Sequence, residues 1–502
     1  MTSGPTSEPA SPGGAPHEER PTTRRSFLAA TAVGVAGVAS AAVGLALGLH
    51  RDFREHTRPL GKALSFSDLD GTDTDASSAI QALLASAGAQ VVLRGTYVLG
   101  SEIIVPPNVG QLILAPGSVL RVRGNHPALT RAGTITFREM TGKTMPSGTT
   151  RLPVRAASAY TVGEYLLVSG ADVVAGSPDR YGYLRQVMAV DLGESEIEVD
   201  SPLPRSITRS PRTSLIELAP VLEISGTGQI LSEDPSGMFS PLIHYFAAEH
   251  PSITGITVSD SGAAGITLSH CLGGVVDCTV SDLLDDGTSH FGYGVNVTGS
   301  TRDARVQGTI SRVRHAVTTN AGGLIVGVGY AGEPENCYFS PDAHDCSNKS
   351  VDTHRLGWGI TIVPRVTGGG GGVQVRSDNA RVVGGSIQGC DGPGVFVSSV
   401  VRVATSIDQV KVKGLHKGQV GILCKGPAAI VEPTVTLASG TGIELNDDSS
   451  VDGGTIDGSA DLGLKILGSR NTVAGLVMGK NVRTHVVESK PSEDNRLSLG
   501  SD

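Results

Sequence analysis

The sequence predicts an all-β protein in which short strands stack as the coils of a parallel solenoid. Glycine is in excess, at 67 of 502 residues, where its usual share is roughly 7%. The glycines separate short runs of β-branched residues, and apolar and polar residues alternate within these runs. Such alternation is typical of strands that bury one face. The runs also recur at a regular spacing, which is typical of repeat architectures.

The N-terminal part of the chain has the features of an export signal. Residues 1–23 are rich in Pro, Gly, Ser and Thr and are expected to be disordered. Arg24-Arg25 precede an apolar stretch that runs to about Leu49, and this arrangement resembles a twin-arginine signal. The resemblance implies a secreted or cell-envelope protein carried by the twin-arginine translocase. Ala39-Ser40-Ala41 is a candidate cleavage site, whereas an uncleaved stretch would act as a membrane anchor.

A capping helix is predicted at the start of the folded domain. Residues 76–87 follow an Asp-rich turn, and Ile80, Leu83, Leu84 and Ala87 have the spacing of one helix face. The open end of a solenoid exposes its core, so an amphipathic helix is a natural cap.

A small β unit is predicted to interrupt the coils, because the runs at 163–168 and 196–199 lack the coil rhythm. The predicted organisation is a disordered N-terminus at 1–23, a signal segment at 24–49, a linker at 50–64, the cap and first coils at 65–134, the inserted β unit at 135–218, and the main β-helix at 219–502.

The repeat is clearest in the C-terminal half, where glycine is followed by an aliphatic residue at the start of successive runs. From Gly372 onward these dipeptides are spaced by 22, 27, 21 and 21 residues. One coil of a β-solenoid has this length. Leucine-rich repeats need a leucine frame and helical repeats need a 3.6-residue period, and the sequence has neither. The dipeptides are Gly294-Val295, Gly372-Val373, Gly394-Val395, Gly421-Ile422, Gly442-Ile443 and Gly463-Leu464.

The start of the domain resembles the N-terminal signature of the pectate lyase superfamily. The matching residues are Asp70-Gly71-Thr72-Asp73-Thr74-Asp75, Ala79-Ile80-Gln81 and Gly95-Thr96-Tyr97. The resemblance extends over roughly residues 65–500 and implies a pectin-lyase-like fold, a right-handed parallel β-helix with an N-terminal capping helix and a small inserted β unit. The superfamily includes lyases, hydrolases, epimerases, fructotransferases and phage tailspikes, so the resemblance leaves the reaction open.

Polar residues in successive coils are predicted to stack in two outward columns. Four runs align when Val295, Val317, Val351 and Val373 are placed in the core. One column then contains Asn296, Thr318, Asp352 and Gln374, and the other contains Thr298, Asn320, His354, Arg376, Ser398 and Lys425. Arg314, His315 and Tyr293 lie at the entrance of these strands.

This surface is the candidate active site, and its residue types suit the chemistry of acidic glycans. Arg376 or Arg314 would neutralise a uronate, His354 or His315 would take the C5 proton, and Tyr293 would donate one. Asp352 would orient His354 or help to ionise it. The predicted catalytic residues are Asp352, His354, His315 and Tyr293, and the predicted substrate-binding residues are Arg314, Arg376, Gln374, Asn296 and Thr318.

Asp352-Thr353-His354 resembles the Asp-Pro-His motif of alginate C5-epimerases and related β-helix lyases. Here Thr353 stands in place of proline, and Arg355 stands in place of a flanking acidic residue. The resemblance implies lyase or epimerase chemistry on a polysaccharide substrate.

Two alternatives stay open. A glycoside hydrolase would pair Asp352 with a second carboxylate from Asp285, Asp286, Glu333, Asp342 or Asp345. A non-catalytic glycan-binding or envelope protein would use the same ladder as a polar surface.

The remaining composition narrows the partners. The net charge of −9 and the pI near 5.8 argue against a nucleic-acid partner. Six cysteines form no CxxC pair, so they are expected as small buried side chains or as disulfides between near neighbours. No cofactor and no metal ligand set is predicted. Aspartates in the loops are nevertheless a ligand type that calcium uses, so a calcium site is left open. The oligomeric state is not predicted.

Overall fold

The computed structural model describes residues 64–67, 74–174, 179–322, 324–325, 329–330, 332–489 and 494–500. The predicted disordered N-terminus 1–23, the signal segment 24–49 and residues 50–63 of the linker lie outside the described residues. So do Asp70–Asp73 of the Asp-rich turn. Among the described residues, no helix is both long and apolar enough to span a bilayer.

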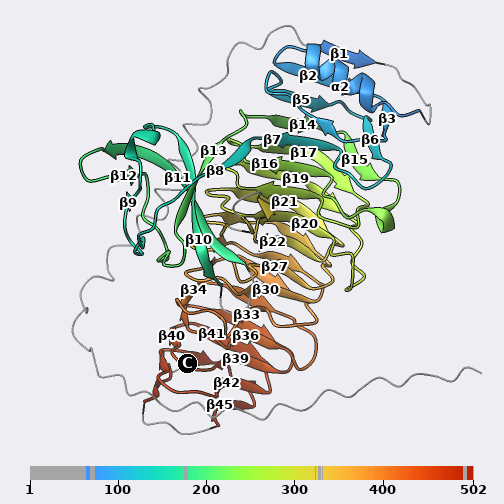
Figure 1. Ribbon diagram of the computed structural model, residues 1–502. Helices are drawn as coiled ribbons and strands as arrows, with labels where there is room; N and C mark the ends of the chain where they lie inside the picture. Colours follow the sequence, from blue (N-terminus) through green and yellow to red (C-terminus); the bar gives the residue numbers. More distant parts are fainter. Residues whose placement is uncertain are drawn as a thin grey trace, which may run out of the picture. The chain divides into compact units, whose positions relative to one another are not determined.

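Over the described residues, the fold is the predicted all-β parallel solenoid, with one short α-helix and a small antiparallel insert. Figure 1 shows the strands stacked coil upon coil, with their colours running along the stack. One face is a 13-stranded parallel sheet. Its strands are β4 (Ile103–Ile104), β7 (Leu129–Ala132), β16 (Ile243–Phe246), β18 (Ile266–Ser269), β20 (Tyr293–Thr298), β22 (His315–Asn320), β27 (Lys349–Asp352), β30 (Gly371–Val375), β33 (Val395–Val397), β36 (Val420–Cys424), β39 (Thr441–Leu445), β42 (Leu462–Ile466) and β45 (Thr484–Glu488).

Two further rows of strands are joined into one 25-stranded sheet. They are joined because three long strands, which pair with one another in series, span both rows: β17 (Ser252–Ser259), β19 (Val275–Ser281) and β21 (Arg305–Ser311). The first row has β1 (Leu64–Ser67), β2 (Gln90–Arg94), β5 (Gln111–Leu114), β14 (Glu223–Gly226), β25 (Tyr338–Phe339), β28 (Thr361–Ile362), β31 (Arg381–Val383), β34 (Thr405–Asp408), β37 (Ala428–Val431), β40 (Ser450–Asp452), β43 (Thr472–Ala474) and β46 (Arg496–Ser498). The second row has β3 (Thr96–Leu99), β6 (Val119–Val122), β15 (Gln229–Ser232), β26 (Asp342–His344), β29 (Arg365–Thr367), β32 (Ser386–Gln388), β35 (Lys411–Lys413), β38 (Thr434–Leu437), β41 (Thr455–Gly458) and β44 (Val477–Met478).

The insert is a six-stranded antiparallel unit with its own core, which includes Leu166, Tyr183 and Ile197. It leaves the solenoid after β7 and returns before β14. Its strands are β8 (Thr134–Met140), β9 (Arg151–Pro153), β10 (Tyr165–Val173), β11 (Arg180–Asp191), β12 (Glu196–Val199) and β13 (Arg212–Glu217). A separate short antiparallel pair, β23 (Leu324–Ile325) and β24 (Gly329–Tyr330), follows β22.

The predicted cap is present as helix α2 (Ser77–Ser86) at the blue end of Figure 1. Ile80 and Leu84 are buried against the first coils, and the Asn108 side chain donates to the carbonyl of Leu84. The helix therefore covers the apolar end of the stack, which would otherwise be exposed to water.

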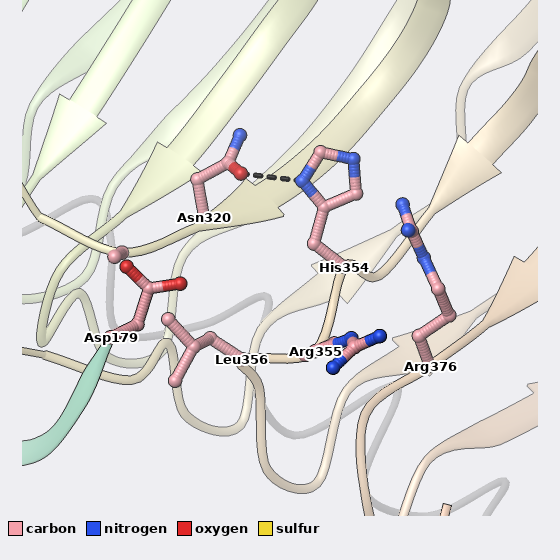
Figure 2. A pocket seen from close by; sticks show the side chains of 7 residues that line it. Asp179, Asn320, His354, Arg355, Leu356 and Arg376 are labelled. Carbon is pink, nitrogen blue, oxygen red and sulfur yellow. Dashed lines mark hydrogen bonds between the residues drawn. The ribbon is translucent and has the colours of Figure 1, made fainter. Parts of the chain in front are cut away.

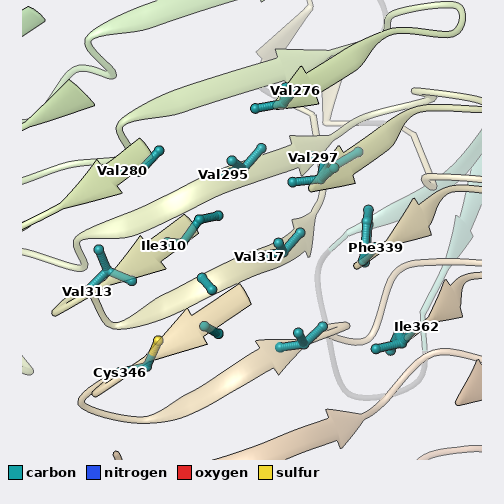
Figure 3. Close-up of a cluster of buried hydrophobic side chains, with 14 of the residues drawn as sticks. Val276, Val280, Val295, Val297, Ile310, Val313, Val317, Phe339, Cys346 and Ile362 are labelled. Carbon is teal, nitrogen blue, oxygen red and sulfur yellow. The ribbon is translucent and has the colours of Figure 1, made fainter. Parts of the chain in front are cut away.

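One continuous core runs through the coils from Ala76 to Val482. Figure 3 shows aliphatic side chains from successive strands, such as Val295 and Val317, stacked inside. The six cysteines belong to this interior: all are buried, and all have free thiols. The expectation of small buried side chains is confirmed.

The glycine of the Gly-aliphatic dipeptides has a steric reason. A Cβ at Gly372 would lie 2.7 Å from Cγ2 of Ile387, and one at Gly421 would lie 2.5 Å from Cγ1 of Val435. These glycines lie at the start of β30 and β36, where the backbone passes close to aliphatic side chains of a neighbouring row of strands. The repeat in the sequence reflects this close approach.

Candidate functional site

The predicted outward column exists in the predicted register. Asn296 pairs with Thr318, Thr318 with Asp352, and Asp352 with Gln374, across β20, β22, β27 and β30. The neighbouring valines Val295, Val317, Val351 and Val373 are fully buried. The column is nonetheless covered, because Thr318 is 0% and Asp352 is 3% exposed, while Asn296 and Gln374 are half-buried.

The second column continues beyond the strand ends. Thr298 pairs with Asn320, but His354 and Arg376 follow the last residues of β27 and β30. Thr353 explains why the chain turns here: its buried hydroxyl accepts the backbone N–H groups of Arg376 (3.0 Å) and Ser377 (3.2 Å). With Thr353 turned inward, Asp352 and His354 lie on the same side of the coil.

Asp352 is the centre of the cluster. Its Oδ1 accepts a hydrogen bond from Arg376 Nε at 2.9 Å, and Oδ2 accepts another from Arg376 Nη2. The Nε2 atoms of His315 and His354 lie 3.5 and 3.4 Å from Oδ2. Burial acts to raise the pKa of the Asp352 carboxyl, but its interactions with His354, His315 and Arg376 outweigh burial and hold the pKa below its usual range. Asp352 is therefore ionised at neutral pH.

His315 lies beneath the surface, with 2% of its residue surface exposed. Its Nδ1 faces the backbone carbonyl of Lys349 at 2.5 Å. Burial lowers the pKa of His315 to about 4, against the favourable charge of Asp352. The imidazole is therefore neutral at pH 7. Its Nε2 is the atom that lies next to Asp352.

Tyr293 joins the cluster from the preceding coil. Its ring stacks on His315, with ring centroids 5.4 Å apart, and stands edge-on to His354 at 6.1 Å. Burial raises the pKa of the Tyr293 phenol, so the group keeps its proton at neutral pH. Arg314 lies nearby, over the ring of Phe291 (4.9 Å) and 2.8 Å from Asp285 Oδ1.

A pocket of about 180 Å³ opens beside this cluster. Figure 2 shows Asn320 joined to His354 by a hydrogen bond, with Arg355 and Arg376 on neighbouring coils. Asn320 also donates from Nδ2 to Asn296 Oδ1 at 2.9 Å. The lining residues are Asp179, Asn320, Ala321, His354, Arg355, Leu356 and Arg376.

Two charged lining residues, Asp179 and Arg355, were not predicted as site residues. Asp179 belongs to the insert, and no repeat in the sequence links it to the coils. Arg355 directly follows His354, and this place in the sequence is the signal that indicates its position at the site.

The insert is held to the solenoid by buried ion pairs. Arg185 of β11 bonds Glu335 at 2.7 Å, and Arg205 bonds Glu333 at 2.9 Å and Asp378 at 2.6 Å. Glu333 also accepts a hydrogen bond from Tyr183 at 2.7 Å and is 0% exposed. These contacts join the insert, to which Asp179 belongs, to the coils that carry the pocket.

The carboxylates suggested for hydrolysis have other partners. Asp285 bonds Arg314 and Ser347, and Asp286 bonds His290 at 2.7 Å. Asp342 and Asp345 lie in or directly after β26, which belongs to the 25-stranded sheet. The described residues that line the pocket include one carboxylate, that of Asp179.

The fold and the cluster together define a parallel β-solenoid with a polar pocket at the C-terminal ends of one row of strands.

The chain matches no family model and no curated protein sequence. Among solved structures it is similar to the Gp54 tailspike of Acinetobacter baumannii bacteriophage AP22, solved in complex with an A. baumannii capsular saccharide, at 14% identity and TM-score 0.55, over 84% of this chain and 75% of that one. It is also similar to the tailspike gp61 of Pseudomonas phage phi297, at 12% identity and TM-score 0.55, over 84% and 72% of the two chains. The fold is thus a parallel β-solenoid like that of these phage tailspikes.

Proposed function

We propose that the chain is an exported enzyme that acts on an acidic polysaccharide by lyase or C5-epimerase chemistry. The observation that carries this proposal is the pocket itself, where His354, Arg355 and Arg376 converge on one opening. Basic side chains in a confined site favour an anionic ligand, and a uronate carboxylate fits that requirement. The AP22 tailspike of the same fold was solved with a capsular saccharide, which supports a glycan as the ligand class.

The proposed reaction begins with removal of the proton on C5 of a uronic acid residue. Neutralising the carboxylate makes this proton acidic enough to be removed. We assign this role to Arg376, which lines the pocket. His354 is the better base, because 21% of its side chain is exposed whereas His315 is buried. Tyr293 keeps its proton and is the donor, to the leaving oxygen in a lyase or to C5 in an epimerase.

Hydrolysis is less well supported by the geometry. A glycosidase needs one carboxyl group that carries a proton and a second that is ionised. Asp352 is tied to Arg376 through both oxygens and stays ionised. The pocket would then need Asp179 to supply the acid from the opposite wall.

The test is turnover on a panel of acidic and neutral polysaccharides. Ultraviolet absorbance of the unsaturated product reports elimination, and exchange of the C5 hydrogen in deuterated water reports epimerisation. We expect one of these signals on an acidic glycan, and a loss of about 10²–10⁴-fold in His354→Ala. His344→Ala is the matched control, since His344 pairs with Asp342 at 3.2 Å on the other sheet.

New reducing ends without an unsaturated product would support the hydrolase instead. Binding of a glycan with no turnover of any kind would support the non-catalytic alternative.

A further inference from the structure

We propose that His315, Asp352 and His354 form a binding site for a divalent transition-metal ion of the zinc class. The three residues come from two neighbouring coils, β22 and the end of β27, and each can direct one ligand atom at a common point. These atoms lie within 4.8 Å of one another. The sequence predicted no metal ligand set, because the three residues are related only through the stacking of coils.

The hydrogen-bond partners of His315 fix which of its nitrogens is available. A backbone carbonyl can only accept a hydrogen bond, so His315 Nδ1 carries hydrogen toward Lys349. Nε2 is therefore the nitrogen left for a metal ion, and it lies 3.5 Å from Asp352 Oδ2. These two potential ligand atoms face each other in a site where both residues are nearly inaccessible to water.

His354 has the same two kinds of contact, with Nδ1 on an acceptor and Nε2 beside Asp352. Its Nδ1 is bonded to the side-chain oxygen Oδ1 of Asn320, which also acts as an acceptor. Its Nε2 lies 3.4 Å from the same oxygen of Asp352. The two Nε2 atoms therefore lie beside one carboxylate oxygen, and a metal ion at that point would be bound by all three atoms in place of any proton on Nε2.

The surroundings match those of metal-bound histidines. Such histidines usually donate their second ring N–H to a carbonyl or a similar acceptor, which fixes the ring orientation. Lys349 O and Asn320 Oδ1 fill that role for the two rings. Arg376 holds the Asp352 carboxylate through both of its oxygens, and Oδ2 keeps a second lone pair for a metal beside its hydrogen bond from Nη2.

The ligand set selects the class of ion. Two imidazole nitrogens and one carboxylate suit zinc, cobalt, nickel or iron(II), whereas calcium and magnesium prefer all-oxygen sites. Three protein ligands leave at least one position open, and the partly exposed His354 places it toward the pocket.

Metal binding stands apart from the proposed glycan chemistry. A bound ion would occupy the Nε2 lone pair that makes His354 a base, so the metal-loaded chain would lose that base. The binding measurement contains no glycan, and turnover is measured separately on metal-free protein. Failure of one proposal therefore leaves the other intact.

The test uses the full chain, stripped of metal by a chelator and titrated with zinc by calorimetry. Cobalt(II) is the second probe, because its visible spectrum reports nitrogen and oxygen ligands. We expect one ion per chain, absent in Asp352→Asn and in His354→Gln. His344→Gln, which removes the histidine of the exposed His344–Asp342 pair, should bind like the unmodified chain.

Asn320→Ala keeps all three ligands and removes a partner of His354, and should weaken binding by about 10–100-fold. Its measurement remains decisive if a buried variant fails to fold. The proposal is overturned if the unmodified chain takes up no ion at this stoichiometry, or if His354→Gln and Asn320→Ala bind as tightly as the unmodified chain.

Discussion

Arg205 provides a direct test of how the insert is attached to the solenoid. Its guanidinium bonds Glu333 at 2.9 Å and Asp378 at 2.6 Å, and it lies over the rings of Tyr181 (4.8 Å) and Trp358 (4.9 Å). Arg205→Met keeps much of the apolar stem and removes the charge. Glu333, at 0% exposure, is then buried without its cation.

The size of the effect follows from the partners that remain. Removing one partner of a buried ion pair costs about 3–5 kcal/mol, because an uncompensated charge stays buried. Glu333 keeps its bond from Tyr183, and Asp378 keeps backbone N–H bonds from Arg402 and Val403. We therefore expect a loss near the lower end, about 3 kcal/mol in the free energy of unfolding.

The assay is urea unfolding, with hydrogen exchange to locate the loosened strands. Exchange should rise in β10 and β11 before it rises in the coils. Arg312→Met is the control, since the Arg312–Asp282 pair is exposed and such pairs contribute little. Adding Glu333→Gln to Arg205→Met should recover part of the loss. A midpoint for Arg205→Met equal to that of the control would refute the reasoning.

Three further predictions concern the core, the coils and the export signal. Burial lowers the pKa of His270 from 6.5 to about 4, so the unfolded chain takes up a proton before the folded chain does as the pH falls. Urea unfolding should therefore show a loss of about 3 kcal/mol in the free energy of unfolding between pH 6.5 and pH 4. His270→Gln should not show this loss. Gly372→Ala should lower the free energy of unfolding by about 1–3 kcal/mol, because a Cβ there would lie 2.1 Å from a carbonyl oxygen of the next coil, whereas Gly88→Ala, with nothing within 4 Å, should not. Replacing Arg24 and Arg25 by lysine should leave the protein in the cytoplasm on cell fractionation, and unchanged export would contradict the twin-arginine hypothesis.

The solenoid could be predicted because its rules are local. Alternation with period two places Val295 and Val317 inside, and the coil period brings Asn296, Thr318, Asp352 and Gln374 into one ladder. A parallel stack repeats one pairing, so sequence spacing is enough to align distant coils.

The site could be predicted only in part, because its remaining features depend on packing between distant segments. Nothing in the spacing shows that Asp179 of the insert reaches the pocket, or that Arg205 meets Glu333 across 128 positions. Burial of His315 depends on the rings stacked over it, and the bond between Arg376 and Asp352 depends on rotamers.

The six thiols of the core have a practical consequence. Their pKa values are raised by burial, to about 12 for Cys271 and Cys424 and about 11 for Cys346, and thiolate is the reactive form. Since none is paired, the chain can complete its folding in a reducing compartment without an oxidant. The thiols are spread along the solenoid, with Cys337 and Cys346 in the coil of β25, β26 and β27, so each would become open to alkylation only when its own segment opens. Mapping the labelled positions over time would then record the order in which the stack comes apart.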